Sequence, residues 1–417
     1  MLGGSTTKSP GRPRVLHVID QLEQLGGAEA SLLALLPRLA VGDQRHGVVV
    51  LRGAIPEREG LTAAGVEVFD GSTGQSRLAN LRTVTRATAR FRPDLIHSTL
   101  FESDLAARLV GAKCRVPVLT SVVNTAYGAD AHAAERTAAW KLRTVRAVDG
   151  LLARRLTVHT HVITEAARAH AVHHLRIDPD ATTLIPRGRD VREMGEPRPD
   201  RRVEVRRRLG WDDDTKVLLN VAREEPQKDQ VTLVRAFGQV AKQHARALLV
   251  IAGRRGRASS DIDEAVAAVG VGERIARLGA RDDVPDLLAA ADLFVFTSRY
   301  EGLGGALIEA AAMRLPIVTT DVPAVLEVVG QHYPWTVPVG DQSAFAQRVE
   351  EALRSSAADR VAVGAQLRRR FEERFELAPV VDATAQLYEH LYACTRGIRP
   401  WSELLRRRQV GAVGASR

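Results

Sequence analysis

The sequence predicts an α/β protein made of two Rossmann-like, doubly wound parallel-sheet domains in tandem, facing each other across a cleft. Three observations support this prediction. The chain has 417 residues, so two domains of about 150–200 residues are expected rather than one core. Short apolar runs alternate with helical segments in both halves, as in parallel sheets covered on both faces. A charged segment with two prolines separates the halves.

Residues 14–190 are expected to form the first domain, after a disordered tail over residues 1–13. A buried strand over 14–20 leads into the pair Gly26–Gly27, and a helix over 30–36 follows. The turn lacks the Gly-x-Gly-x-x-Gly spacing of a dinucleotide fingerprint. Further apolar runs predict strands near residues 47–51, 65–69, 94–97, 117–122, 161–164 and 182–185.

Residues 191–205 are interpreted as the interdomain linker, and residues 206–380 as the second domain. Residues 381–417 are assigned to a C-terminal helix and a basic tail. In open parallel sheets, ligands bind beyond the carboxyl ends of the strands. Two such domains would therefore place both sets of strand ends around one cleft. The strands of the second domain are predicted near residues 216–222, 247–252, 275–278, 291–297, 316–319 and 335–338.

Composition leaves several partner classes open. The formal net charge is +9, which fits nucleic acid, an anionic membrane or a polyanionic substrate, and equally fits solvated arginine-rich faces. Cys114 and Cys394 form no CxxC pattern, which indicates a reducing cytoplasm and argues against structural zinc. No apolar stretch approaches the roughly 18–20 residues of a spanning helix. We therefore expect a cytoplasmic protein, at most peripheral to the inner face of a membrane.

The most informative stretch runs from Glu301 to Glu309. An apolar strand precedes it, Gly302, Leu303, Gly304 and Gly305 form a turn, and strong helix formers follow. A helix start with free backbone N–H groups binds anions. The two carboxylates are suited to accepting hydrogen bonds from sugar hydroxyls. Nucleotide sugars combine phosphate with hydroxyls, although Glu309 alone would also complement the helix dipole.

Two further patterns fit the same chemistry. Arg223 and Lys228 follow the strand near 216–222, and a guanidinium and an ammonium there can grip one diphosphate. The alternative is that both are solvated and paired with the neighbouring acids Glu224, Glu225 or Asp229. Gly253 ends another strand, and with the loop that carries Arg281 it is expected to form a wall that reads a base.

His97 is the polar candidate at a strand end of the first domain. We predict that it faces the acceptor, with a satisfied structural histidine as the alternative. The pairs His173–His174 and His159/His161 have no partnering carboxylates in the sequence. No metal site is therefore expected.

Taken in order, these motifs resemble the family 4 retaining glycosyltransferases of GT-B fold (glycosyltransferase group 1). The resemblance rests on Arg223-x4-Lys228, Gly253, Gly279, the strand from Asp292 and Glu301-x7-Glu309, within residues 216–329. The first half fits more loosely, through Gly26-Gly27-Ala28-Glu29 and a hinge at Ile185-Pro-Arg-Gly-Arg-Asp190. Arg187 replaces the usual Asn of that hinge, Val123-Asn124 replaces a frequent His-Asn, and Gly305 replaces a frequent Pro.

The resemblance implies a role for each matched residue. Arg223 and Lys228 would hold the leaving diphosphate, and Glu309 would bind the ribose. Glu301, with Gly302 and the amides of Leu303, Gly304 and Gly305, would hold the donor sugar and phosphate. Gly27 would approach the diphosphate from the other domain. Arg223, Lys228 and Glu301 would be catalytic, His97 and Asn124 would lie on the acceptor side, and no cofactor or metal would be needed.

The implied function is transfer of a sugar from a nucleoside-diphosphate donor to an acceptor hydroxyl with retention of configuration. A UDP-sugar is preferred to GDP-mannose as donor. The acceptor would be a glycan or a lipid-linked molecule, in polysaccharide, glycolipid or cell-envelope glycan synthesis, with the loops 71–80 and 124–137 choosing it. A nucleotide-sugar epimerase on the same fold is the alternative. A basic nucleic-acid-binding protein is disfavoured because no aromatic residues interleave the arginines.

Overall fold

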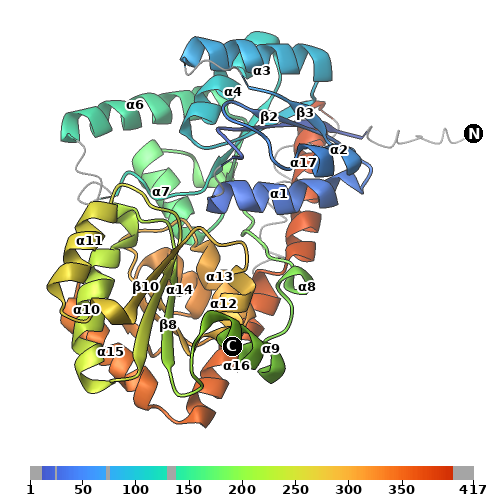
Figure 1. Cartoon of the computed structure of the whole chain (residues 1–417). Coiled ribbons are helices and arrows are strands. Elements are labelled where there is room, and N and C mark those ends of the chain that lie inside the picture. The colour runs from blue at the N-terminus through green and yellow to red at the C-terminus, as the bar shows by residue number, and fades with distance from the viewer. Residues whose placement is uncertain (1–11, 24–25, 72–75, 129–137, 398–417) are drawn as a thin grey trace, which may run out of the picture.

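Both halves of the chain form parallel sheets with one common strand order in the computed structural model (Figure 1), which describes residues 12–23, 26–71, 76–128 and 138–397. The first sheet has the order β3-β2-β1-β4-β5-β6-β7, and the second has the order β10-β9-β8-β11-β12-β13. The strand pairings that define these sheets are parallel. Each sheet winds outward from its first strand to one edge and then to the other, as in the Rossmann fold. The predicted fold class is confirmed.

The elements of the first sheet and its helices span residues 14–184. Its strands are β1 (Arg14–Ile19), β2 (Arg45–Val50), β3 (Glu67–Phe69), β4 (Leu95–Thr99), β5 (Val118–Val122), β6 (His159–Val162) and β7 (Thr182–Leu184). The helices are α1 (Gly27–Ala40), α2 (Arg58–Ala63), α3 (Arg77–Phe91), α4 (Phe101–Cys114), α6 (Ala139–Leu156) and α7 (Glu165–Leu175), with the 3-10 turn η1 (Pro179–Ala181).

The second sheet lies within residues 216–337, and three long helices follow it. Its strands are β8 (Lys216–Val221), β9 (Ala247–Ala252), β10 (Ile275–Gly279), β11 (Leu293–Phe296), β12 (Ile317–Thr320) and β13 (Thr336–Val337). The helices are α10 (Gln230–Gln243), α11 (Ser259–Ala268), α12 (Val284–Ala290), α13 (Gly305–Ala312), α14 (Pro323–Val329), α15 (Gln342–Arg354), α16 (Ala357–Arg374) and α17 (Leu377–Thr395), with η2 (Pro226–Lys228) and η3 (Gly272–Arg274).

Strands β11 and β12 illustrate why the sequence pattern is so apolar. All four residues of each strand are buried, because helices cover both faces of the sheet. A strand that is buried on both faces reads as a continuous apolar run instead of an alternating one.

The segment expected to be the linker, residues 191–205, is largely helical. It contains α8 (Val191–Met194) and the first part of α9 (Pro199–Leu209). Pro199 occupies the first turn of α9, where a missing N–H costs nothing. Arg206 is buried, and its guanidinium reaches Asp292 at 2.7 Å and the carbonyl of Ala290 at 3.0 Å. The two prolines therefore mark a helix start that packs on the second domain.

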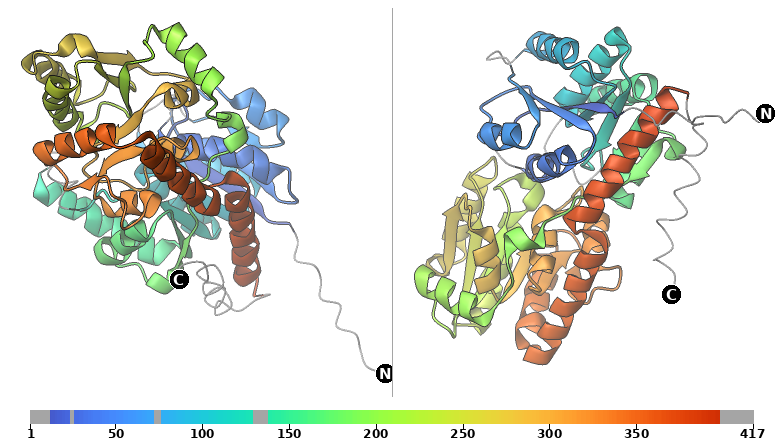
Figure 2. Two further views of the ribbon diagram at one scale, coloured as in Figure 1. Left: turned by 90° about the horizontal axis from the view of Figure 1, so that it is seen from below. Right: turned by 90° about the vertical axis from the view of Figure 1, so that its right-hand side faces the viewer.

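The last helix, α17, returns to the first domain, as Figure 2 shows in its right-hand view. It begins at Leu377, whereas the sequence placed the C-terminal helix from residue 381. Leu387, Tyr388 and Leu391 of α17 pack with Val15 and Leu119 of the first sheet. The chain thus crosses between the domains a second time, through a buried apolar contact. Residues 1–11 of the expected tail and residues 398–417 lie outside the described residues.

A chain of hydrogen bonds joins α17 to the first sheet. The carbonyl of Ile185 can only accept, so His161 donates to it from Nε2 (2.8 Å) and accepts at Nδ1 from Ser121 (2.8 Å). Ser121 in turn accepts from His97 Nε2 (2.6 Å), and Tyr388 donates to His97 Nδ1 (2.7 Å). Burial lowers the pKa of His97 well below 6.5 and that of His161 to about 4, so both histidines are neutral at pH 7, as these donor and acceptor roles require.

Lowering the pH from 7 to 5 should destabilise the protein. Burial also lowers the pKa of His46, beside His17, to about 4. A histidine whose folded pKa lies below 6.5 binds fewer protons than in the unfolded chain. Its stabilising contribution is complete above about pH 6.5 and is lost as the pH falls toward 4. We expect a loss of about 2 kcal/mol each for His46 and His161 at pH 5, measured by urea unfolding.

The matched variants separate this effect from general acid sensitivity. His46→Gln should reduce the dependence of the unfolding free energy on pH between 7 and 5. His332→Gln, at an exposed histidine, should leave that dependence unchanged. If the pH dependence is the same in His46→Gln as in the wild-type protein, protonation of buried His46 is not a cause of the destabilisation.

Candidate active site

The turn between β11 and α13 lies at the carboxyl end of the second sheet. Gly304 precedes the helix with a φ of +84°, which favours glycine. No side chain caps α13, although the N–H of Leu307 donates to the carbonyl of Gly304 at 3.0 Å. The start of the helix carries the positive end of the helix dipole. Leu303, within the turn, is buried. The strand, glycine turn and helix that the sequence indicated are all present.

Lys228 and Glu301 form an ion pair beside this turn. Lys228 Nζ lies 2.5 Å from Glu301 Oε1, and both side chains are largely buried. Backbone contacts bring the two loops together, because Thr297 donates to the carbonyl of Lys228 (2.9 Å). Two patterns separated by 73 positions in the sequence therefore meet at one point.

Arg223 follows β8 and lines a pocket between the two domains. The pocket has a volume of about 390 Å³ and is lined from the first domain by Asn124 and Ala126. The second domain contributes Arg223, Glu225, Gln227, Arg257 and Tyr300. Among the described residues, no carboxylate forms an ion pair with the half-buried guanidinium of Arg223. A cation without such a partner in an interdomain pocket is available for an anionic ligand.

The acids next to Arg223 and Lys228 have other partners. Glu224 is buried and pairs with Arg277 at 2.5 Å. Glu225 pairs with Arg257 at 2.8 Å, and Asp229 pairs with Arg299 at 3.1 Å. The alternative in which these acids neutralise Arg223 and Lys228 is therefore not what the structure shows.

Gly302 is in direct contact with the first domain. A Cβ at this position would lie 1.9 Å from the carbonyl oxygen of Val123, so only glycine fits. Thr164 donates to the carbonyl of Gly302 at 2.9 Å, and Thr125 donates to that of Glu301 at 3.1 Å. These contacts hold the glycine turn against the strand ends of the first sheet.

The hinge between β7 and α8 places two arginines in the same region. Arg189 donates from Nε to Glu309 Oε1 at 2.7 Å, and its Nη2 lies 2.7 Å from the position of a Cβ on Gly305. Arg187 Nη1 lies 3.1 Å from the corresponding position on Gly27. The hinge therefore contacts two features that the sequence indicated: Arg187 lies beside Gly27, and Arg189 pairs with Glu309.

Arg189 was missed by the sequence analysis, and Arg187 was noted only as a departure from the hinge pattern. Two basic residues flanking Gly188 at a domain crossing were the available signal. Burial and the neighbouring Arg189 lower the pKa of Arg187 to about 10, against the opposing effect of Glu29 and Glu301. Arg187 therefore remains a cation at neutral pH.

The predicted acceptor-side residues occupy different surroundings. His97 is buried, and Tyr388 and Ser121 engage both of its ring nitrogens. The structure therefore places His97 in the interior, as in the structural alternative, and not on the cleft surface. Asn124 is exposed and lines the interdomain pocket. Residues 72–75 and 129–137, within the two loops expected to choose the acceptor, lie outside the described residues.

Gly253 and Arg281 both follow strand ends of the second sheet. A Cβ on Gly253 would lie 1.9 Å from the carbonyl oxygen of Ala222, so the position requires glycine. Arg281 donates two hydrogen bonds to Asp283, at 2.8 and 2.7 Å. Any contact of Arg281 with a base would have to form beside this pair, so its binding role stays a prediction.

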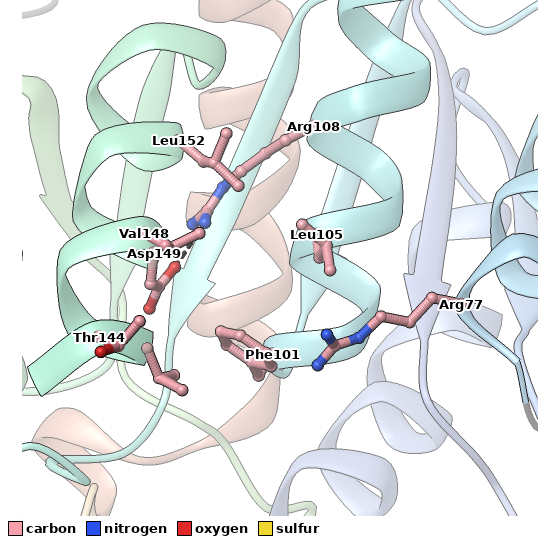
Figure 3. A pocket seen from close by; sticks show the side chains of 9 residues that line it. Arg77, Phe101, Leu105, Arg108, Thr144, Val148, Asp149 and Leu152 are labelled. Carbon is pink, nitrogen blue, oxygen red and sulfur yellow. Dashed lines mark hydrogen bonds and ion pairs between the residues drawn. The ribbon is translucent and has the colours of Figure 1, made fainter. Parts of the chain in front are cut away.

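Among the described residues, no group of three His, Cys, Asp or Glu side chains could hold a metal ion. A second pocket, of about 210 Å³, lies within the first domain between α4 and α6 (Figure 3). Its wall includes Phe101, Val148 and the ion pair of Arg108 with Asp149 at 2.6 Å. It lies on the first domain, away from the turn at Glu301.

Comparison with known proteins covers both domains. The model of the group 1 glycosyl transferases matches residues 201–374, and that of the glycosyl transferase 4-like domain matches residues 12–188. A kanosaminyltransferase of Streptomyces kanamyceticus is 31% identical over 31% of this chain and 33% of its own length. A putative glycosyltransferase of Bacillus subtilis, EpsF, is 27% identical over 74% of this chain and 79% of its own length. The match thus spans only a third of the first of these relatives.

Solved structures resemble the chain along most of its length. Alr3699/HepE of Anabaena, solved with UDP and glucose, has a TM-score of 0.75 and 21% identity, covering 90% of this chain and 99% of that one. WaaG, a glycosyltransferase involved in lipopolysaccharide biosynthesis, has a TM-score of 0.71 and 17% identity, with coverage of 90% and 99%. At these identities the likeness shows the fold. Together with the family models, it shows that the chain belongs to the group 1 glycosyltransferases of GT-B fold.

Proposed function

We propose that this protein transfers a sugar from a nucleoside-diphosphate sugar to an acceptor hydroxyl with retention of the anomeric configuration. The observation that carries the proposal is the interdomain pocket with the unpaired Arg223, beside the Lys228–Glu301 pair and the uncapped start of α13. A UDP-sugar is the preferred donor, with GDP-mannose second. UDP and glucose bound to the structural neighbour from Anabaena support this preference.

The charges of the site suit departure of a diphosphate. As the glycosidic bond lengthens, negative charge grows on the leaving oxygen, and preorganised cations lower the barrier. Arg223 would grip the phosphates with its planar fork. Lys228, already held in place by Glu301, would add a fixed positive charge. The arrangement assigns no side chain as nucleophile and no charge-neutralising role to a metal ion.

Nucleoside diphosphates should raise the melting temperature of the protein by several degrees. A ligand present at 100 times its dissociation constant stabilises the folded state by about 2.7 kcal/mol. Thermal unfolding with UDP, GDP and ADP, each compared with its nucleoside, measures this shift and identifies the base. If none of the three diphosphates raises the melting temperature, the proposed function is wrong.

Replacing Lys228 by Ala should lower the rate of donor cleavage by roughly 100-fold or more, because a preorganised charge beside the leaving group is lost. The assay measures release of nucleoside diphosphate from the donor sugar identified by the thermal screen. Lys242→Ala, at an exposed lysine of α10, is the matched control. Near-normal cleavage by the Lys228→Ala protein would reject the mechanism.

We further propose that the first domain contacts an anionic membrane through α6, where a lipid-linked acceptor would be reached. Trp140, Val145, Val148 and Leu151 of this helix are exposed. The same helix carries five basic residues, and its one acid, Asp149, is buried and paired with Arg108. A helix with exposed apolar and basic side chains suits an anionic interface. Among the described residues, no helix has the length and apolarity to cross a bilayer.

Vesicle binding tests this contact. The protein should sediment with vesicles of phosphatidylcholine and phosphatidylglycerol and much less with phosphatidylcholine alone. A Trp140→Glu/Leu151→Glu variant should lose most of the binding, because charge replaces apolar contact. Val361→Glu, at an exposed valine of α16, is the control. Equal sedimentation of both variants with the anionic vesicles would refute a role for α6.

A further inference from the structure

Arg189 connects three parts of the active-site region. Its Nε donates to Glu309 Oε1 at 2.7 Å, and its Nη1 donates to Ser31 of α1 at 3.2 Å and to the carbonyl of Gly188 at 3.0 Å. The side chains of Arg189 and Glu309 are 13% and 23% exposed. The guanidinium therefore lies at the junction of the hinge, the first domain and α13, partly shielded from water.

The guanidinium of Arg189 lies beside the start of α13. Its Nη2 lies 2.7 Å from where a Cβ on Gly305 would be, and Gly305 is the first residue of that uncapped helix. The same helix start is the phosphate site of the proposed function. Arg189 is thus already adjacent to the expected phosphate, while its hydrogen bonds go to Glu309 and Ser31.

Arg187 approaches the same region from the other side. Its Nη1 lies 3.1 Å from the position of a Cβ on Gly27, where α1 begins. It forms no ion pair with a described carboxylate, although Glu29 and Glu301 lie near enough to influence it. The start of α1 already holds the carboxylate of Glu29, which accepts from the N–H of Gly26 at 3.1 Å. The start of α13 and the two hinge arginines therefore carry the attraction for an anion in this region.

Ion pairs balance part of this charge. Glu301 is paired with Lys228, and Glu309 is paired with Arg189. A ribose hydroxyl that donates to Glu309 Oε1 would compete with Arg189 for that oxygen. Breaking that pair would leave a partly buried guanidinium without a counter-charge, which is costly. A phosphate at the start of α13 would supply the new counter-charge in the same step.

We propose that Arg187 and Arg189 are donor-phosphate ligands, and that Arg189 exchanges Glu309 for the diphosphate when the donor binds. The exchange frees Glu309 for the ribose hydroxyls and conserves a charge-assisted pair on the arginine. Phosphate and carboxylate can each accept two parallel hydrogen bonds from a planar guanidinium, so the exchange preserves the hydrogen-bond geometry of the arginine. This inference rests on the proposed function, because it assigns residues to its donor.

The exchange predicts opposite effects of one substitution on two ligands. In Arg189→Gln, a nucleoside should bind several-fold more tightly, because Arg189 no longer competes with the ribose for Glu309 Oε1. The corresponding nucleoside diphosphate should bind roughly 10- to 100-fold more weakly, because a charge-assisted contact is lost. Titration calorimetry with uridine and UDP, or with the guanosine or adenosine pair if the thermal screen selects that base, measures both affinities.

Two further variants keep the test decisive. Arg187→Gln should weaken diphosphate binding and leave nucleoside binding unchanged. Arg192→Gln removes an arginine of the next helix whose side chain is 85% exposed and paired with Asp190, so it should change neither affinity. If Arg189→Gln fails to fold, Arg189→Lys replaces it and should show smaller shifts in the same directions, because it keeps the charge without the fork.

The outcomes separate this inference from the proposed function. If the wild-type protein binds none of UDP, GDP and ADP, the proposed function is wrong, because the protein then has no nucleoside-diphosphate donor. A wild-type protein that binds one of them, with equal weakening of nucleoside and diphosphate in Arg189→Gln, would overturn only the exchange. An unchanged ratio of the two affinities in both arginine variants would also overturn the assignment of Arg187 and Arg189 as phosphate ligands.

Discussion

The backbone of Gly302 lies against the carbonyl of Val123 with no room for a side chain between them, and the geometry of the site depends on this contact. A Cβ there would lie 1.9 Å from the oxygen. The hydrogen bonds from Thr164 and Thr125 fasten the same turn. Because the turn carries Glu301 and leads into α13, the contact places a carboxylate and a helix start at the edge of the first domain. Parallel sheets that meet at their carboxyl ends make such an arrangement natural.

The electrostatics of the junction follow from partial burial. Charges that leave water need partners. Here Lys228 pairs with Glu301 within the second domain, and Arg189 of the hinge pairs with Glu309. Such pairs hold side chains in fixed positions while leaving them exchangeable for a ligand of matching charge. Arg223 lies outside these pairs and opens onto the pocket. The region thus combines paired cations with Arg223 and Arg187, for which no ion pair with a described carboxylate is present.

The first domain is held by a different kind of contact. Helix α17 returns from the second domain, and Tyr388 begins a hydrogen-bonded chain that runs through His97, Ser121 and His161 to the carbonyl of Ile185. Each of these four side chains donates one hydrogen bond to the next group in the chain, so the hydrogen bonds form with both histidines neutral. His97 therefore serves the junction between α17 and the sheet. A histidine at a strand end looks alike in the sequence whether it faces a ligand or an incoming helix.

The fold class could be predicted from the sequence, and so could the strand, glycine turn and helix around residues 302–305. Strands buried on both faces read as apolar runs, and the glycine turn at residues 302–305 announces a helix start, because both signals arise from neighbouring residues. The ion-pair partners of the charged residues in the site could not be predicted from the sequence. The pair of Lys228 with Glu301 joins residues 73 positions apart, and that of Arg189 with Glu309 joins residues 120 positions apart. Packing of two loops within the second domain decides the first pair, and packing of the hinge between the domains decides the second. No local sequence pattern encodes contacts over such separations.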